Sequence, residues 1–438
     1  MVPITDSFSN QVEGFFSFWE DKMKKVLKWL LVAVLAIVVV VGCFVAYVAM
    51  SGLPHYETKK IDLKVESTPA RVAHGRDLAL SLCVMCHRNP STKLLTGTQM
   101  LDMPEQFGKA YSKNITQHPT KGIGKWTDGD IAWLLRTGIH PHTGSYVPPW
   151  MIKLPHMADE DIYSIIAWLR SDDPMLAASD VDNVPSEPTL LAKILTRVVF
   201  KPFDYPTSAI PYPDTNNTYK YGKYLTTGVY DCYGCHLADF ADMDPLTPEN
   251  SKGFFGGGNP MKDATGLTVF TANITPDKAT GIGNWTRDQF IQTMSTGIRP
   301  DGKPMRYPMA RAHRLNDLAL GSMYDYIKTV PAISNKVERI APTGPWKSDG
   351  ARLFDTYACS SCHSKTGIGH ADLSLADAKY PSDSILAEVI KDQVRYNPDG
   401  YMPKFDGVIG EKDMSTLVQY VRQLCKKQDG IKALSYAK

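Results

Sequence analysis

The sequence has almost no net charge. Its 438 residues include 48 lysines and arginines against 46 aspartates and glutamates, which gives a formal net charge of +2. Proteins that bind nucleic acid carry an excess of basic residues, so this balance argues against a nucleic-acid partner. The chain is also too long for one small core, and its length predicts two to four domains.

Cysteines are scarce outside one recurring motif. Six of the eight cysteines fall in that motif, which leaves Cys43 and Cys425. Cys43 stands in an apolar run, and Cys425 stands beside Lys426 near the C-terminus. A disulfide between them is one alternative, but a membrane-buried thiol and a small core residue are the simpler interpretation. The sequence therefore gives no sign of a disulfide framework.

The motif is Cys-x-x-Cys-His, and it occurs at 83–87, 232–236 and 359–363. This is the attachment signature of haem c, in which two thiols bond to the haem vinyl groups and the histidine binds the iron. A zinc site would need further cysteine or histidine pairs at ligand spacing, and none appear. We therefore expect three haem c groups, held by Cys83, Cys86, Cys232, Cys235, Cys359 and Cys362, with His87, His236 and His363 as axial ligands.

One long apolar run precedes the motifs. From Leu27 to Met50 the only charged residue is Lys28, and the run is long enough to cross a hydrocarbon core of roughly 30 Å as a helix. Further lysines precede it, so the positive-inside rule places the N-terminus in the cytoplasm. We expect a single-pass anchor in the bacterial inner membrane, with everything after about Gly52 in the periplasm.

Two alternatives to an uncleaved anchor remain open. A cleaved signal peptide has a shorter apolar core and a small-residue cleavage site, and no such site follows here. Val40-Val41-Gly42-Cys43 looks like a bacterial lipobox, which would lipidate Cys43, although the apolar run continues to Val48. Residues 1–26 form either an amphipathic helix on the inner membrane face or a simple extension of the anchor.

The first two motifs are followed by the same block of sequence. Asn-Ile-Thr, Gly-Ile-Gly, Trp-Thr and Thr-Gly-Ile recur at a constant offset, at 114–116, 122–124, 126–127 and 137–139, and at 273–275, 281–283, 285–286 and 296–298. Such a repeat indicates duplicated domains. The second copy has a longer insert with a glycine-rich stretch at 254–258, which we expect to be a loop.

Each motif lies between two expected helices. The first contains a glycine, and the second has apolar residues at i, i+3, i+4 and i+7 and an aromatic residue at a fixed point. A glycine lets a partner helix with a large ring approach closely, which resembles the crossed terminal helices of cytochrome c. The three pairs are Gly75 with Trp168, Gly222 with Tyr326, and Gly350 with Tyr420.

These features predict a mostly α chain with three tandem cytochrome c domains after one N-terminal transmembrane helix. A helix from Thr189 to Phe200 is expected in the first linker, ahead of a proline-rich stretch. The expected parts are a cytoplasmic segment (1–26), the anchor (27–50), cytochrome c domains at 68–173, 215–330 and 346–430, and linkers at 174–214 and 331–345.

The ligand on the other side of each iron decides between electron transfer and catalysis. Cytochromes c that only carry electrons use methionine opposite histidine. A methionine in a proline-containing loop precedes the last helix of each unit, and we expect these to be the ligands: Met151, Met309 and Met402. Met157 and Met305 compete, and so does bis-histidine ligation through His140, His142, His156, His313 or His370. Only methionine supplies one scheme for all three units.

The Asn-Ile-Thr block, standing between Cys-x-x-Cys-His and a Pro-x-Met type loop, resembles a known family. It is similar to the triple-haem cytochrome c subunits of bacterial membrane-bound alcohol, gluconate and sorbitol dehydrogenases, over roughly 70–427. The chain departs from that pattern in its N-terminal spanning helix and in Ile152 and Ala310, which replace a frequent proline. The resemblance implies that Asn114, Asn273, Trp126 and Trp285 lie close to haem or its propionates, and a plain structural role is equally open.

The resemblance implies a carrier of single electrons from a catalytic partner to the membrane quinone pool or an oxidase. We expect a respiratory membrane complex or dehydrogenase as donor, and an oxidase or soluble cytochrome as acceptor. The chain would then be an electron-transfer protein or a dehydrogenase subunit rather than a catalyst by itself. The alternative is a haem enzyme, such as a multihaem peroxidase or a thiosulfate-oxidising cytochrome, which would need one iron with an open site.

Overall fold

The computed structural model describes residues 6–100, 103–148, 150–338, 344–366 and 372–436, and their side chains except those of 6–18, 20, 21 and 427–436. Pro149, His370 and part of the expected 331–345 linker lie outside the described residues, as do most side chains of the expected cytoplasmic segment.

The described chain is mostly helical, as the sequence predicts. The longer helices are α1 (Asp6–Met50), α2 (Pro69–Ala79), α4 (Asp128–Thr137), α5 (Asp159–Leu169), α6 (Leu190–Val198), α9 (Arg287–Thr296), α10 (Asp317–Ile327), α11 (Asp349–Thr356), α14 (Asp383–Lys391) and α15 (Glu411–Tyr436). The shorter ones are α3 (Met85–His87), α7 (Thr218–Lys223), α8 (Cys232–Cys235), α12 (Cys359–His363) and α13 (Ala376–Lys379). Two π-helical turns occur at Leu80–Val84 and Tyr224–Val229.

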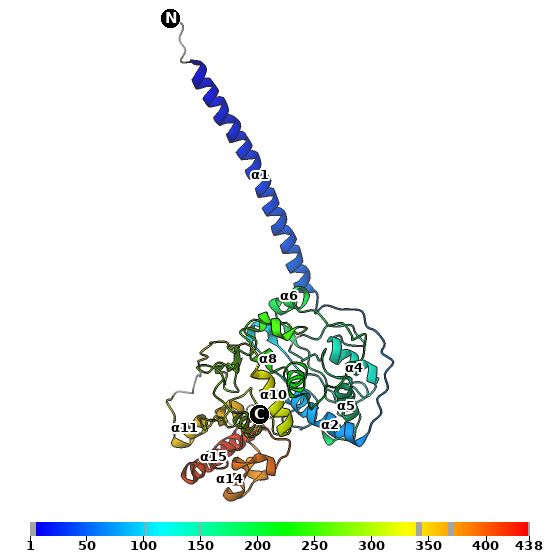
Figure 1. Cartoon of the computed structure of the whole chain (residues 1–438), viewed down its shortest axis with the longest axis vertical. Helices are drawn as coiled ribbons and strands as arrows, with labels where there is room; N and C mark the ends of the chain where they lie inside the picture. Colours follow the sequence, from blue (N-terminus) through cyan, green and yellow to red (C-terminus); the bar gives the residue numbers. More distant parts are fainter. Residues whose placement is uncertain (1–5, 101–102, 149, 339–343, 367–371, 437–438) are drawn as a thin grey trace. The chain divides into compact units, whose positions relative to one another are not determined.

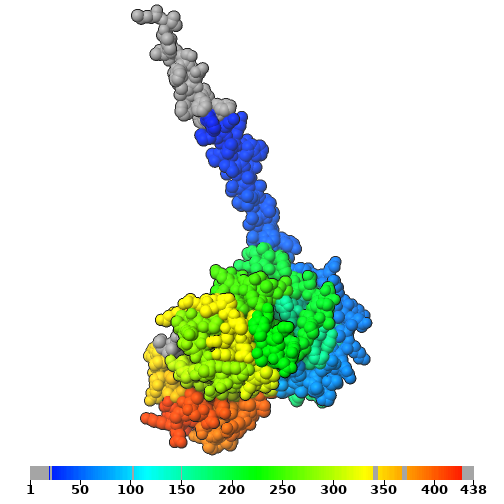
Figure 2. Space-filling model, viewed as in Figure 1, coloured from blue at the N-terminus to red at the C-terminus, as the bar shows by residue number. Residues whose placement is uncertain are grey.

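The chain divides into two compact units. The first consists of 1–54 and 189–201, and the second of 55–188 and 202–438. In the first unit, α1 runs without a break to Met50 and packs against α6 near its C-terminal end (Figure 1). The stretch Lys22–Met50 is apolar and long enough to cross a membrane, and Figure 2 shows it uncovered on the face in view.

The helix α6 fulfils the expectation of a short helix in the first linker. It begins after Thr189, whose side chain accepts a hydrogen bond from the Ala192 amide. Lys193 donates to the Ala49 carbonyl at 3.0 Å, and Arg197 donates to the Gly52 carbonyl at 2.6 Å. Basic side chains thus cap the C-terminal end of α1, where backbone carbonyls lack partners within the helix.

In the second unit, three helix pairs pack at the expected glycines: α2 with α5, α7 with α10, and α11 with α15. Atoms of Tyr326 and Tyr420 are among the nearest at Gly222 and Gly350, but at Gly75 the backbone of Ser164 and Ile165 takes the place expected for Trp168. A Cβ atom at Gly75 would lie 1.8 Å from the Ser164 carbonyl oxygen, and one at Gly222 would lie equally close to that of Ser322. At Gly350 it would lie 2.6 Å from Cβ of Tyr420. Only glycine permits these approaches, so the crossings fix the helices on either side of each motif.

The shared sequence blocks frame matching helices. Thr127 and Thr286 are the N-caps of α4 and α9, each in a reciprocal capping box with the residue three positions on. Gly138 and Gly297 end the two helices in the left-handed conformation, with φ of 76° and 79°. The Trp-Thr and Thr-Gly-Ile parts of the repeat are therefore helix start and stop signals.

Strands are few in the described chain. β1 (Gly108–Lys109) pairs antiparallel with β2 (Glu187–Pro188), with Gly108 opposite Pro188. β3 (Pro260–Lys262) pairs antiparallel with β4 (Thr268–Phe270), with Pro260 opposite Phe270. The insert of the second repeat thus contains a hairpin after its glycine-rich stretch.

The buried apolar residues of the second unit form two clusters. One is shared by the first two repeats and includes Leu80, Trp168, Phe255 and Leu320. The other belongs to the third repeat and includes Phe405. The duplicated repeats therefore share a continuous core.

Candidate haem-binding sites

Each Cys-x-x-Cys-His motif includes a short helix: α3 after Cys83, α8 over Cys232–Cys235 and α12 over Cys359–His363. A π-helical turn ends immediately before α3 in the first site, and another ends shortly before α8 in the second. Asp231 and Ala358 take left-handed conformations, with φ of 47° and 57°, directly before Cys232 and Cys359. Such features are uncommon away from functional sites because they cost conformational energy.

The first cysteine of each motif is partly buried. Burial raises the pKa of the Cys83, Cys232 and Cys359 thiols to about 12. Burial likewise raises the pKa of the Cys362 thiol to about 11. The thiols stand here for the thioether sulfurs of an attached haem, which do not titrate. An apolar crevice of this kind suits a porphyrin ring.

The histidines of the first two motifs are held in the same way. His87 donates from Nδ1 to the Lys113 carbonyl at 2.7 Å, and His236 donates from Nδ1 to the Ala272 carbonyl at 2.7 Å. A carbonyl can only accept, so the proton sits on Nδ1 and the lone pair on Nε2 is left to bind a metal. Burial lowers the pKa of both imidazoles, which keeps them neutral as a ligand must be.

The accepting carbonyls belong to Lys113 and Ala272, the residues directly before the asparagine that opens the shared sequence block. Asn114 accepts hydrogen bonds from the amide and hydroxyl of Thr116, and its own amide group donates to the carbonyls of Ser179 and Val181. Its Oδ1 and amide group therefore both have partners within the protein. Of the two alternatives for Asn114, these contacts support a structural role.

Asn273 repeats the arrangement in the second site. It accepts from Thr275 at 3.0 and 2.7 Å and donates to the carbonyls of Ile333 and Asn335. In both sites the asparagine ties the segment that holds the histidine to the chain that follows the last helix of the repeat. Such an arrangement would fix the orientation of His87 and His236 as ligands of a haem iron.

The third site lacks this block and is built differently. The ring of His363 lies 6.4 Å from that of Phe354, centroid to centroid, on the first helix of the crossed pair. The hydroxyl of Ser361, inside the motif, donates to the Ala358 carbonyl at 2.7 Å. A side chain of the motif itself thus bonds to the backbone at the start of the motif helix.

The methionines expected on the other side of the irons lie in the loops that the sequence suggests. Met151 is half-buried against the shared core, and Met402 is half-buried against the core of the third repeat. Met309 is 39% exposed. The competing Met157 is 0% exposed and belongs to the shared core. Met151 and Met157 both pack in or against the shared core, and the ligand assignments stay predictions.

The competing histidines have other partners. The rings of His140 and His142 lie 5.0 and 5.3 Å from that of Trp126. His156 bonds through Nε2 to the Pro245 carbonyl, and His313 bonds through Nε2 to the Pro398 carbonyl. Nε2 of His156 and of His313 thus takes part in a contact with another loop, and Nδ1 of His140 accepts from the His142 and Thr143 amides of its own loop.

Several buried donors that the sequence did not single out lack an acceptor among the described residues. They include Nε of Arg306, Nε of Arg311 and Nε1 of Trp133. A buried donor without a partner is costly, so such groups suit a ligand that brings its own acceptors. Haem carries two propionates. The donor set, the neutral histidines and the buried thiols together fit haem c.

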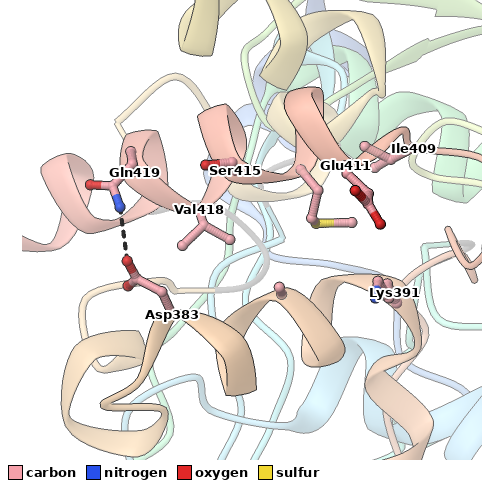
Figure 3. Close-up of a pocket in the computed structure, with 9 residues that line it drawn as sticks. Asp383, Lys391, Ile409, Glu411, Ser415, Val418 and Gln419 are labelled. Atoms are coloured by element: carbon pink, nitrogen blue, oxygen red, sulfur yellow. Dashed lines mark hydrogen bonds between the residues drawn. The ribbon is translucent and has the colours of Figure 1, made fainter.

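A cavity of about 250 Å³ lies between α14 and α15 in the third repeat (Figure 3). Asp383, Lys391 and Met414 are among the residues that line it, and Gln419 donates to Asp383 across its edge at 2.8 Å. Its lining includes none of the motif cysteines or histidines. We assign it no part in the haem sites.

Comparison with known proteins agrees with this chemistry. Residues 347–421 match the family model described as cytochrome C oxidase, cbb3-type, subunit III. The fructose dehydrogenase cytochrome subunit of Gluconobacter japonicus is 25% identical, over 81% of this chain and 80% of that protein. The chain is similar to the cytochrome c subunits of dehydrogenases.

Two further relatives carry the same description. The cytochrome c subunit of the alcohol dehydrogenase (quinone) of Gluconacetobacter polyoxogenes is 25% identical, over 74% of this chain and 70% of that protein. The gluconate 2-dehydrogenase cytochrome c subunit of Pantoea cypripedii is 24% identical, over 69% and 71%. The resemblance to cytochrome c subunits is therefore confirmed, and it supports haem c as the cofactor and electron transfer as the activity.

Proposed function

We propose that this cytochrome c relative is a membrane-anchored carrier of three haems, which relays single electrons from a dehydrogenase partner to a respiratory acceptor. The observation that carries the proposal is the repeated bond from the motif histidine to the backbone carbonyl of the residue just before the Asn-Ile-Thr block, Lys113 or Ala272. It leaves Nε2 of His87 and of His236 in the state that binds iron. Bound haem would supply reversible one-electron exchange at its iron.

The protein's own residues make that exchange easy. The fixed imidazoles of His87 and His236 and the thioether bonds from the motif cysteines would hold each haem in one position in both redox states. Methionine ligands at Met151, Met309 and Met402 would keep water from the irons. Little rearrangement would then accompany each transfer.

The donor we propose is a dehydrogenase, because the relatives are described as subunits of fructose, alcohol and gluconate dehydrogenases. An oxidase or a soluble cytochrome would be the acceptor. Membrane attachment would rest on α1, which continues through Cys43 to Met50 as an uncleaved anchor requires. The lysines before the apolar run would keep the N-terminus in the cytoplasm and the haem sites in the periplasm.

The helix α6 supports the same orientation. Its Leu190, Leu191 and Val198 are 40%, 45% and 60% exposed, while Lys193 and Arg197 hold the end of α1. An exposed apolar face beside basic residues suits the headgroup region of a bilayer. We therefore propose that α6 lies on the periplasmic surface of the inner membrane.

The test is a haem count on the full chain purified from membranes. Mass spectrometry of the denatured protein should give the polypeptide plus three covalently held haems, and fewer than three would overturn the proposal. The competing haem enzyme would keep one iron with an open site. Carbon monoxide binding stoichiometrically to one haem of the reduced protein would favour the enzyme, and no binding would favour the carrier.

A further inference from the structure

In each repeat, the loop with the expected methionine ligand or the segment after it contacts a neighbouring repeat. Each contact lies close in sequence to the haem motif of that neighbour. In the first repeat this segment leads from Met151 into α5. Its His156 bonds through Nε2 to the Pro245 carbonyl at 3.0 Å, and its Ala158 amide donates to the Tyr224 hydroxyl at 3.0 Å. Tyr224 opens the π-helical turn before the second motif. The ligand segment of the first repeat therefore contacts the chain on both sides of the second haem motif.

The second repeat makes the same kind of contact with the third. The Tyr307 amide, two residues before Met309, donates to the Ser361 hydroxyl at 3.3 Å. The Ala264 amide, from the turn between β3 and β4, donates to the Ser361 carbonyl at 2.9 Å. Ser361 lies between the two cysteines of the third motif and is 1% exposed. The ligand loop of the second repeat thus covers the third haem site.

The third repeat returns to the first. The Tyr401 hydroxyl, one residue before Met402, donates to the Leu80 carbonyl. Leu80 opens the π-helical turn that leads into Cys83 and is fully buried. These two residues are 321 positions apart in the chain. The contact therefore brings the last haem site onto the first.

Charged residues from all three repeats meet beside this last contact. Arg76 of α2 donates two hydrogen bonds to the Asp399 carboxylate, at 3.0 and 2.7 Å. Arg314 of the second repeat donates to the same carboxylate at 2.5 Å and to Asp77 of the first repeat at 2.9 Å. Burial raises the pKa of Asp399, but its hydrogen bonds to Arg76 and the nearby arginine charges outweigh it, and the net shift is downward. The Asp399 carboxylate is therefore ionised at neutral pH.

We propose that the three haem sites form a closed ring, in which each site touches both others, and that Asp399 is the positioning residue that closes it. The contacts run head to tail, from the first repeat to the second, from the second to the third, and from the third back to the first. This inference rests on the proposed function, because it assumes a haem at each motif. Electrons entering at one haem would then reach either of the others directly, without passing through an obligatory middle site.

Pulsed electron paramagnetic resonance on the oxidised full chain tests the ring without any substitution. Three low-spin irons give three dipolar couplings, and a ring predicts three comparable distances. A longest distance close to the sum of the other two would mean a linear array and would overturn the inference. The haem count on the same sample separates the outcomes: three haems in a line refute the ring alone, whereas fewer than three refute the proposed function.

The role of Asp399 is tested by Asp399→Asn, which removes the charge but keeps the shape. We expect the variant to retain three covalent haems and to show a changed optical spectrum and midpoint potential at one haem, that of Met402. Asp383→Asn, at a 57% exposed carboxylate of the same repeat, is the matched control and should change neither. If the midpoint potentials of all three haems in Asp399→Asn equalled those of the unmodified protein, Asp399 would not be a positioning residue.

Discussion

His236 donates its Nδ1 proton to the carbonyl oxygen of Ala272 across 2.7 Å, although 36 residues separate them in the chain. His87 makes the same bond to Lys113 over 26 residues. The longer separation reflects the insert of the second repeat, which carries the β3–β4 hairpin. The same bond forms despite that difference in loop length because the accepting carbonyl always belongs to the residue directly before the Asn-Ile-Thr block, which follows the insert.

Asn273→Ala tests whether this block sets the properties of a haem. The variant removes the Asn273 donor from the carbonyls of Ile333 and Asn335, and Ile333 keeps only the bond from the Thr275 hydroxyl among the described contacts; this loosens the segment at Ala272. We expect a loss of about 1–3 kcal/mol in the free energy of unfolding. We also expect a higher midpoint potential at one haem, because a weaker Nδ1 bond makes the imidazole a poorer electron donor.

Redox titration of the holoprotein measures that shift. Asn284→Ala, at an exposed asparagine of the same repeat that bonds only to the nearby Lys278 carbonyl among the contacts described, is the matched control. If both variants left all potentials where they were, the block would have no part in tuning the iron.

Gly222→Ala tests the close helix crossing of the second repeat. The added methyl group would lie 1.8 Å from the Ser322 carbonyl oxygen, which belongs to backbone and cannot rotate away. We expect a loss of about 1–3 kcal/mol from overpacking, and a lower yield of chains that carry all the haems. Gly410→Ala is the control, since nothing lies within 4 Å of its added atom. Equal thermal unfolding of the two variants would contradict the crossing.

Much of this architecture could be predicted from sequence, because its signals are local. The haem motifs, the glycines of the crossed helices and the helix starting at Thr189 each depend on a few neighbouring residues. The π-helical turn at 80–84 and the left-handed Ala358 could not be predicted, since no periodicity or residue preference announces them. The pairing of Arg76 with Asp399 spans 323 residues and depends on how the repeats pack.

The His74–Asp161 pair predicts a pH dependence of stability. Its hydrogen bond to Asp161, at 2.6 Å, raises the pKa of His74 above the ordinary value of 6.5. A raised pKa means that the pair stabilises the fold fully below about pH 6.5 and loses this effect as the pH rises through the folded-state value. Because His74 is 45% exposed, solvent screening holds the effect below about 1 kcal/mol.

The measurement is the difference in thermal unfolding temperature between the unmodified protein and His74→Gln across this pH range. The difference should shrink toward alkaline pH. His142→Gln is the control, since its ring lies 3.8 Å from the nearest carboxylate oxygen. A difference that grew with pH would mean that the pair is not charged in the folded protein.

Spin labelling tests the membrane position proposed for α6. A labelled cysteine at Val198, in a background of Cys43→Ser and Cys425→Ser, should be relaxed more strongly by oxygen, which partitions into lipid, than by a water-soluble nickel chelate. A label at Asp182, whose side chain is 86% exposed, should show the opposite preference in the same bilayer. If Val198 behaved like Asp182, α6 would face water and only α1 would remain as the membrane contact.

Met402→Ala tests the expected ligand of the third iron. Methionine sulfur keeps a haem iron six-coordinate and low-spin, so its loss should leave one haem of three high-spin and able to bind carbon monoxide when reduced. The backbone amide of Met402 donates a hydrogen bond to Oε1 of Gln393 at 3.3 Å. This bond does not involve the methionine side chain, so the loop backbone should keep its position in the variant. Met414→Ala, at a methionine of the same repeat that lines the cavity between α14 and α15, is the control and should leave all three haems low-spin. Unchanged low-spin spectra in Met402→Ala would remove Met402 as a ligand, whereas a high-spin haem in both variants would point to a general loosening of the third repeat.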